Sequence, residues 1–210
     1  MPPLPFPVFT RNRYFTGKLL DEKDLTEEQD YVVGKDRLLN RALHGWGIVD
    51  GLEAEPGHGD AGITVGPGVA IDGWGREIVL PTSLPLTMPP GAGWVTIRVG
   101  YEEFDADPLP MPGEETPPMF GTVVEGYTVW TEPGLPPSPP PDSDPSTLPS
   151  DPSVVLATIR RSSKRPHLHI DTTTHRREIP SNAKLLEMVQ RLEARLARLL
   201  GERNPTEPSP

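Results

Sequence analysis

The stretch ITVGPGVAIDGWGREIVL, residues 63–80, decides the fold class of this chain. Apolar side chains alternate with polar or small ones on either side of two glycine turns, Gly66–Gly68 and Gly73–Gly75. A period of two puts alternate side chains on one face of a strand, and Asp-Gly is typical of a tight hairpin turn. We therefore predict a β-hairpin or adjacent paired strands here, with no helix in the span.

Short apolar runs of the same kind continue on both sides of this stretch, separated by glycine and proline. They lie at 48–52, 95–99, 123–129, 154–159 and 168–170. Strands this short at this spacing are typical of a small β-sandwich or barrel, which we place at residues 46–178. Two proline-rich stretches inside it, 105–119 and 132–152, are predicted to be loops or semi-rigid linkers.

An amphipathic helix is predicted before the β-rich domain, over residues 21–45. Asp21 or Asp24 can cap it, and Gly45 is placed to end it, while Gly34 weakens its centre. Its apolar positions recur at near-heptad spacing, at Leu25, Val32, Leu39 and Leu43. The chain is thus expected to be mainly β with helical ends.

A second helix is predicted over residues 179–203, with a disordered tail at 204–210. Its apolar residues alternate spacings of three and four along one seam, which is a coiled-coil pattern. The seam consists of Asn182, Leu185, Val189, Leu192, Leu196 and Leu199. Apolar residues beside the seam widen the stripe, which favours three or more helices or packing against the chain's own domain. We expect a parallel homotrimer, with Asn182 setting its register.

The N-terminal residues 1–20 are expected to form an extended arm. Proline alternates there with large apolar residues that need a surface to lie on, so we predict docking through Leu4, Phe6 and Phe9. Trp74, at the tip of a predicted turn, is a fourth docking candidate. The start of the chain does not resemble a signal peptide, and we expect synthesis and assembly in the cytoplasm, with release as part of an extracellular particle.

Charge is distributed unevenly along the chain. Residues 1–157 carry 9 Lys and Arg against 24 Asp and Glu, whereas residues 158–203 carry 11 against 5. The acidic majority argues against nucleic-acid binding, which needs clustered cations. The basic segment is interpreted either as a docking surface for an acidic partner or as solvated helix faces. No apolar run is long enough to span a bilayer, so no membrane insertion is expected.

No catalytic or cofactor site is expected. The chain has no cysteine, which removes thiolate chemistry and disulfides. Asp72, Arg76 and Glu77 are interpreted as parts of a hairpin turn, because no further residue completes a catalytic set. His167 and His169 share one face of an extended segment and are the candidates that a metal site would use, but the expected metal is none.

Several segments together resemble a known class of proteins. They are NRYFTGKLLDEKDLTEEQDY at 12–31, LHGWGIVDGLE at 43–53, residues 63–80, VVLATI at 154–159 and HIDTTTHRREIP at 169–180. They resemble uncharacterised proteins encoded with phage-tail-like contractile injection systems, and PGVAIDGWGREI is similar to domains that open tail-fibre and baseplate proteins. The resemblance implies a multimeric, non-catalytic component of a tail-like particle.

Two other functions stay open at this stage. A carbohydrate- or cell-surface-binding module would use exposed aromatic rings as stacking platforms, and the candidates are Trp46, Trp74, Trp94 and Trp130. A metal-dependent hydrolase would use His167, His169 and His175. The leading hypothesis is a structural protein that acts by self-association and by docking to other particle components.

Overall fold

The structure is a computed structural model that describes residues 7–57, 62–89, 93–109, 119–136, 148–161 and 168–202. The chain forms two compact units, Met1–Ile179 and Pro180–Pro210. The second unit contains the helix α2 (Asn182–Glu202). The elements of the first unit are α1 (Glu22–Leu39), the π-helical turn η1 (Asn40–His44), β1 (Gly47–Gly51), β2 (Ala54–Pro56), β3 (Ile63–Val65), β4 (Gly68–Ile71), β5 (Glu77–Leu80), β6 (Leu84–Leu86), β7 (Gly93–Leu109), β8 (Met119–Pro133), β9 (Val154–Arg161) and β10 (His169–Asp171).

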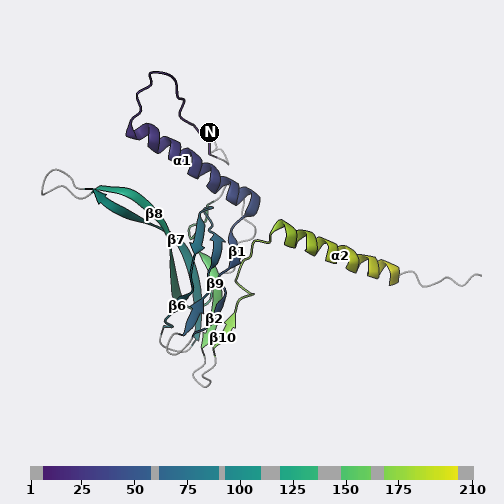
Figure 1. Cartoon of the computed structure of the whole chain (residues 1–210). Coiled ribbons are helices and arrows are strands. Elements are labelled where there is room, and N and C mark those ends of the chain that lie inside the picture. Colours follow the sequence, from purple (N-terminus) through teal and green to yellow (C-terminus); the bar gives the residue numbers. More distant parts are fainter. Residues whose placement is uncertain are drawn as a thin grey trace, which may run out of the picture. The chain divides into compact units, whose positions relative to one another are not determined.

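The strands of the first unit pair antiparallel in three sheets (Figure 1). Their orders are β1-β4-β5, β2-β3-β6 and β10-β9-β7-β8. The prediction of a mainly β chain with a helix near each end is confirmed. The barrel alternative is wrong, because each sheet in the described part of the chain keeps two edge strands and none closes on itself.

The stretch at 63–80 forms the predicted hairpin. β4 pairs with β5 from Gly68 opposite Leu80 to Ile71 opposite Glu77. The turn between them closes through a hydrogen bond of 2.9 Å from the backbone N–H of Gly75 to the carbonyl of Asp72. β3 does not pair with β4, its neighbour in sequence, as it would in a simple meander. It pairs with β2 and β6 in another sheet. The glycines between β3 and β4 therefore carry the chain from one sheet to the next.

One hydrophobic core joins the three sheets. Ile48 of β1, Ile63 of β3 and Ile97 of β7 are fully buried or nearly so, and each comes from a different sheet. The alternation expected from the sequence is visible in β5, where Ile78 and Leu80 are buried. Alternating apolar residues in the sequence thus give this strand one apolar face, which lies in the core.

The loop predicted at 105–119 is shorter than expected. β7 continues to Leu109 and β8 begins at Met119, so the two strands form a long ribbon whose outermost pair is Leu109 with Met119. β9 pairs with β7 only as far as Val99, and beyond that point no described strand pairs with this edge of β7. Pro108 is tolerated in this part of the ribbon because a free edge needs no N–H donor. Similarly, β8 runs to Pro133, inside the loop predicted at 132–152.

The N-terminal helix departs only slightly from the predicted bounds of 21–45. Asp21 caps α1 by accepting a hydrogen bond of 3.0 Å from the backbone N–H of Asp24. The last turn widens into η1, and Gly45 ends it with φ of 77°. The near-heptad residues are exposed, and these are Leu25, Val32, Leu39 and Leu43.

α1 contacts the β-strands through its C-terminal end. Asn40 Nδ2 donates to the carbonyl of Gly75 at 3.0 Å, and Arg41 Nη1 donates to the carbonyl of Trp74 at 2.6 Å. Gly75 has φ of 83°, and a Cβ there would lie 2.1 Å from the carbonyl oxygen of Arg37. Glycine is therefore required at this point by conformation and by the closeness of the helix. None of the described helices is long and apolar enough to cross a membrane.

Candidate interaction surfaces

The seam of α2 is exposed along its whole length. Ser181 caps the helix by accepting a hydrogen bond of 3.2 Å from the backbone N–H of Lys184. The exposed fractions rise from 43% at Leu185 to 63% at Leu192. All six predicted seam residues lie on α2 and are exposed, namely Asn182, Leu185, Val189, Leu192, Leu196 and Leu199. A helix of this kind buries its stripe only by associating with something else.

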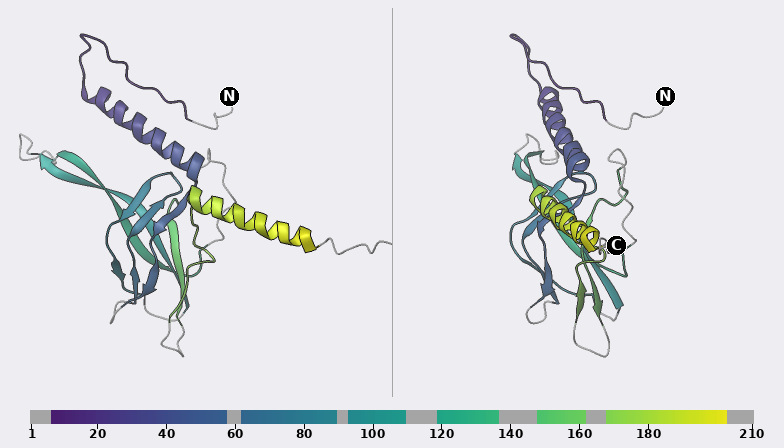
Figure 2. Two further views of the ribbon diagram at one scale, coloured as in Figure 1. Left: turned by 45° about the vertical axis from the view of Figure 1, so that its right-hand side comes forward. Right: turned by 90° about the vertical axis from the view of Figure 1, so that its right-hand side faces the viewer.

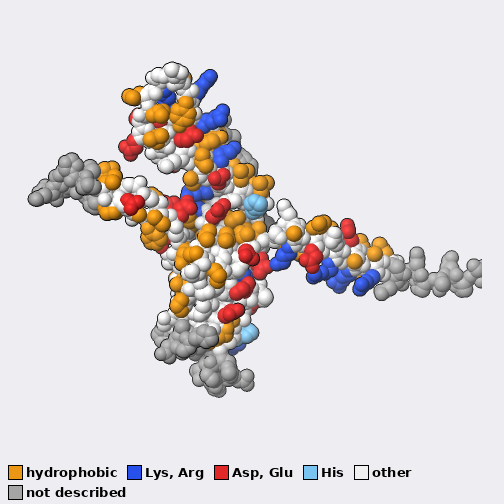
Figure 3. Space-filling model, in the orientation of Figure 1, with side chains coloured by type: hydrophobic (Ala, Val, Ile, Leu, Met, Phe, Trp, Pro, Cys, Tyr) orange, Lys and Arg blue, Asp and Glu red, His pale blue; other side chains and the backbone are white. Residues whose placement is uncertain are grey.

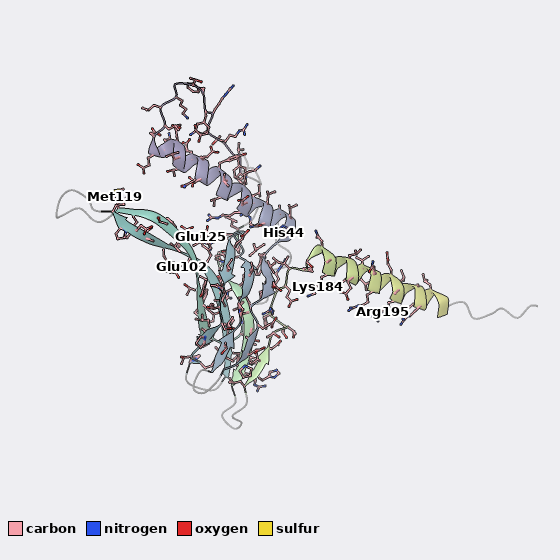
Figure 4. The ribbon with its side chains drawn as sticks, viewed as in Figure 1. His44, Glu102, Met119, Glu125, Lys184 and Arg195 are labelled. Atoms are coloured by element: carbon pink, nitrogen blue, oxygen red, sulfur yellow. The ribbon has the colours of Figure 1, made fainter. Side chains whose placement is uncertain are left out.

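Basic side chains lie beside the apolar stripe of α2. Figure 3 shows hydrophobic side chains along one side of the helix and Lys and Arg along another. Lys184, Arg191 and Arg198 are seven residues apart and so lie in one row. Figure 4 shows Lys184 and Arg195 on the same side of α2. In a coiled coil built on the predicted seam, the row of three would face outward.

The segment just before α2 is tied firmly to the β-strands. Ile48 N donates to the carbonyl of Arg177 at 2.8 Å, and Ile179 N donates to the carbonyl of Ile48 at 2.7 Å. Ile48 and Glu178 thus form a short parallel bridge beside β1. Sequence reasoning did not identify this pairing, because HRREIP carries no strand periodicity.

Arg176 locks the same segment. Its side chain is only 3% exposed, and Nη1 and Nη2 donate to the carbonyls of Leu52 and Gly51 at 2.8 and 2.7 Å. Nη2 also contacts Glu53 Oε1 at 2.9 Å. We call Arg176–Ile179 the C-terminal clamp. Two residues separate Ile179 from the start of α2 at Asn182.

Of the predicted docking residues in the arm, Leu4 and Phe6 lie outside the described residues. Phe9 lies against α1, where a Cβ on Gly34 would be 3.0 Å from Phe9 Cε1. The ring also meets Tyr31 edge to face, with centroids 6.2 Å apart. Gly34, which weakens the helix in sequence terms, therefore provides the space in which Phe9 packs.

Polar contacts continue this attachment of the arm to α1. Asn12 Nδ2 donates to Asp24 Oδ1 at 2.8 Å, and Lys18 Nζ lies 2.7 Å from the same oxygen. The hydrogen bonds from Lys18 and Asn12 hold the pKa of Asp24 below its usual value. The arm is thus bound by its own helix, and its docking to a second protein stays a prediction.

Trp74 is engaged within the chain. Its indole Nε1 donates to the carbonyl of Pro149 at 2.9 Å, its ring lies against the guanidinium of Arg76, and 37% of the residue is exposed. Asp72, which is fully buried, accepts from the backbone N–H groups of Trp74 and Arg76, both at 2.9 Å. The predicted turn is confirmed, and docking through Trp74 stays a prediction.

A pocket of about 170 Å³ lies where α1 meets the base of the β7–β8 ribbon. Arg76 lies between Trp74 and Tyr101, with its Cζ 4.6 and 4.7 Å from the two ring centroids. Burial, with hydrogen bonds to Glu103 and Glu125, raises the pKa of Tyr101 above its usual value. These contacts attach Tyr101, at the base of the ribbon, to the segment of Trp74 and Arg76. The lining residues are Val33, Asp36, Arg37, Asn40, Gly75, Arg76, Glu77, Tyr101 and Glu125.

The described histidine candidates for a metal site do not form a cluster with other possible ligands. His167 lies outside the described residues, whereas His169 is exposed on β10 and His175 is half-buried. Among the described residues, no three His, Asp or Glu side chains are grouped so as to hold a metal ion. Asp171, close in sequence to both, instead accepts hydrogen bonds from Thr173 and Thr174, which lower its pKa.

No protein-family model matches this sequence, and no curated protein does so. Among solved structures, a chain of the type VI secretion system TssK-TssF-TssG baseplate subcomplex is 14% identical, with a TM-score of 0.52 over 93% of this chain and 73% of that one. A chain of a type VI secretion baseplate complex is 13% identical, with a TM-score of 0.47 over 97% and 72% of the two chains. TssK is 14% identical, with a TM-score of 0.44 over 78% and 41%. The first of these likenesses shows that this chain shares its fold with a baseplate protein.

Proposed function

We propose that this chain is a non-catalytic structural component of a phage-tail-like contractile injection particle. The observation that carries the proposal is the exposed seam of α2, which marks a surface for association. Two further points support it. The sequence resembles proteins encoded with such systems, and the fold resembles that of a chain from the type VI secretion baseplate, which is itself a phage-tail-like system.

Association is proposed to produce a parallel homotrimer through α2. The apolar stripe extends beyond the two seam positions because Leu186, Met188 and Leu200 are also exposed. A stripe of this width suits three helices better than two. About three heptads are marginal in isolation, so the first unit must contribute to the same association. The C-terminal clamp ends only two residues before α2, so the first unit and the helix are joined by a short connection.

The first unit is proposed to be a β-sandwich that docks to other particle components. Ile48, Ile63 and Ile97 contribute to one core from three sheets, which is how packed sheets bury their inner faces. The exposed surfaces of α1 and of the β7–β8 ribbon are then left for partners.

The first experiment asks whether the protein is part of a particle. Particles are purified from the producing cells, and their proteins are identified by mass spectrometry beside the soluble and released fractions. We expect the chain in intact particles, both inside cells and after release. Its presence in the soluble fraction alone would contradict the proposal.

The second experiment asks for the oligomeric state. Light scattering is measured on the full chain and on residues 1–179, which retain the whole described core and the C-terminal clamp. We expect a trimeric mass for the full chain and a smaller mass for the shortened one. A monomeric mass for both would rule out the trimer.

The carbohydrate-binding alternative gains no support from the aromatic residues. Trp46 is stacked by Arg177, with the guanidinium carbon 4.7 Å from the ring centroid, and Arg160 lies over Trp94 at 5.7 Å. Trp130 covers Gly100, where a Cβ would lie 3.1 Å from the ring. Together with Trp74, all four rings lie against groups of the same chain.

A further inference from the structure

The outer part of the β7–β8 ribbon is exposed on both faces in the part of the chain that the structure describes. We call residues 102–109 and 119–126 the outer ribbon. Most of these residues are exposed, and Ala106 and Gly126 are half-buried. Figure 2 shows from two further sides that the ribbon extends beyond the other strands. A two-stranded ribbon in water is marginally stable by itself. Contacts with another molecule would therefore stabilise the outer ribbon.

One face of the outer ribbon is apolar. Phe104 lies opposite Val124, and Pro108 lies opposite Phe120, so these four side chains share a face. Phe104, Phe120 and Val124 are 47, 44 and 47% exposed. A Cβ on Gly126 would lie 2.5 Å from Phe104 Cε2, so glycine makes room for the ring and fixes where it lies. Figure 4 shows Met119 at the far end of the same ribbon.

The outer ribbon is also strongly acidic. It carries five carboxylates and no Lys, Arg or His, and residues 99–159 contain no Lys or Arg at all. Among the described residues, Arg37 of α1 forms an ion pair at the base of the ribbon, where its Nη2 lies 3.6 Å from Glu103 Oε1. The five carboxylates are Glu102, Glu103, Asp105, Asp107 and Glu125.

We propose that the outer ribbon is the docking surface for another protein of the particle, whose segment presents apolar side chains flanked by Lys or Arg. The apolar face requires cover, and the charge selects a basic partner. A second ribbon is a poor occupant because it would bring ten carboxylates together. Nucleic acid and anionic lipid are repelled for the same reason. The inference rests on the proposed function and adds to it the chemistry of the partner.

The test uses the full-length protein and three labelled peptides. Two are designed amphipathic peptides with the same leucine positions, one with lysine and the other with glutamate at every polar position. The third has the sequence of residues 180–203, the basic helix of this chain. Fluorescence anisotropy gives the affinities at two salt concentrations.

We expect the lysine peptide to bind, more weakly at high salt, and the glutamate peptide to bind at least about tenfold more weakly. The double variant Phe104→Ser/Val124→Ser should reduce the affinity for the lysine peptide about tenfold, because each substitution removes an apolar side chain from the contact surface. The control is Val79→Ser on β5, which removes a side chain 54% exposed outside the ribbon and should change nothing. Circular dichroism confirms that both variants are folded.

Three outcomes would overturn the inference. They are equal affinity for the lysine and glutamate peptides, equal loss in the ribbon and control variants, and ribbon-dependent binding of the 180–203 peptide at the affinity of the lysine peptide. The last would make a second copy the occupant. Trimer mass and presence in particles are measured separately, so failure of the proposed function can be recognised apart from failure of this inference.

Discussion

The Nε atom of Arg76 lies 2.7 Å from Oδ2 of Asp72, and the Asp72 side chain is completely buried. The same carboxylate accepts two backbone N–H groups of the turn between β4 and β5. We predict that Asp72→Ala lowers the free energy of unfolding by about 3–5 kcal/mol, because it leaves a largely buried guanidinium and two donors without their acceptor. Urea denaturation measures the change.

The matched control for this prediction is Asp50→Ala, which removes an exposed aspartate from β1. Its effect should stay within about 0.5 kcal/mol. Equal losses of unfolding free energy in the two variants would show that the buried Asp72 carboxylate contributes no more to stability than an exposed one.

The contact between Phe9 and Gly34 predicts how the arm can be released. Gly34→Leu places a side chain where the Phe9 ring lies, so the ring must leave, while the helix itself gains propensity. We expect faster trypsin cleavage after Arg11 and Arg13, with helix content unchanged or higher. Phe9→Ala should produce the same cleavage pattern. Unchanged cleavage in both variants would contradict the packing of the arm on α1.

The seam of α2 predicts a position-dependent loss of the trimer. Leu192→Asp introduces a charge at the centre of the seam and should convert the full chain to monomer, because an unpaired buried charge costs several kcal/mol. Gln190→Asp adds the same charge two residues earlier, off the seam, and should leave the trimer intact. Light scattering and thermal unfolding distinguish the two. Trimers in both variants would locate the interface elsewhere.

The turn after β10 predicts an unusually acidic aspartate. Thr174 and Thr173 hydrogen-bond to the ionised form of Asp171 and so lower its pKa. A carboxyl group with a lowered folded pKa stabilises the fold at pH values above its unfolded pKa, and this contribution is lost as the pH falls through the folded pKa. Carboxyl-carbon NMR should therefore give Asp171 a midpoint below the ordinary 3.8. A midpoint at or above 3.8 would disprove these hydrogen bonds.

The sequence pattern correctly predicted those parts of the fold that depend on residues close together in the sequence. The β4–β5 hairpin follows from the alternation around Ile78 and from the Asp72-Gly73 turn, and the cap of α1 follows from Asp21. The length of β7 could not be predicted, because Asp105 to Leu109 has the composition of a loop and is extended only by pairing with β8. Sequence pattern carries no signal for that pairing.

The candidate surfaces divide in the same way. The seam of α2 could be read from spacing alone because it lies on one helix. The apolar face of the outer ribbon combines Phe104 and Val124 from two strands, so it exists only after the register is known. The role of Arg176 depends on carbonyls of Gly51 and Leu52, whose approach no local spacing reveals.

The C-terminal clamp has a consequence for how the chain folds. Arg176 reaches Leu52 across a separation of 124 residues, so the free edge of β1 can be covered only after almost the whole first unit has been synthesised. Closing so large a loop is slow, and an uncovered edge strand is a site for incorrect pairing during that time. Fragments that stop before residue 176 should therefore tend to aggregate, whereas a chain that stops at Ile179 can complete the closure. During translation the first unit therefore stays incompletely folded until the C-terminal clamp has left the ribosome.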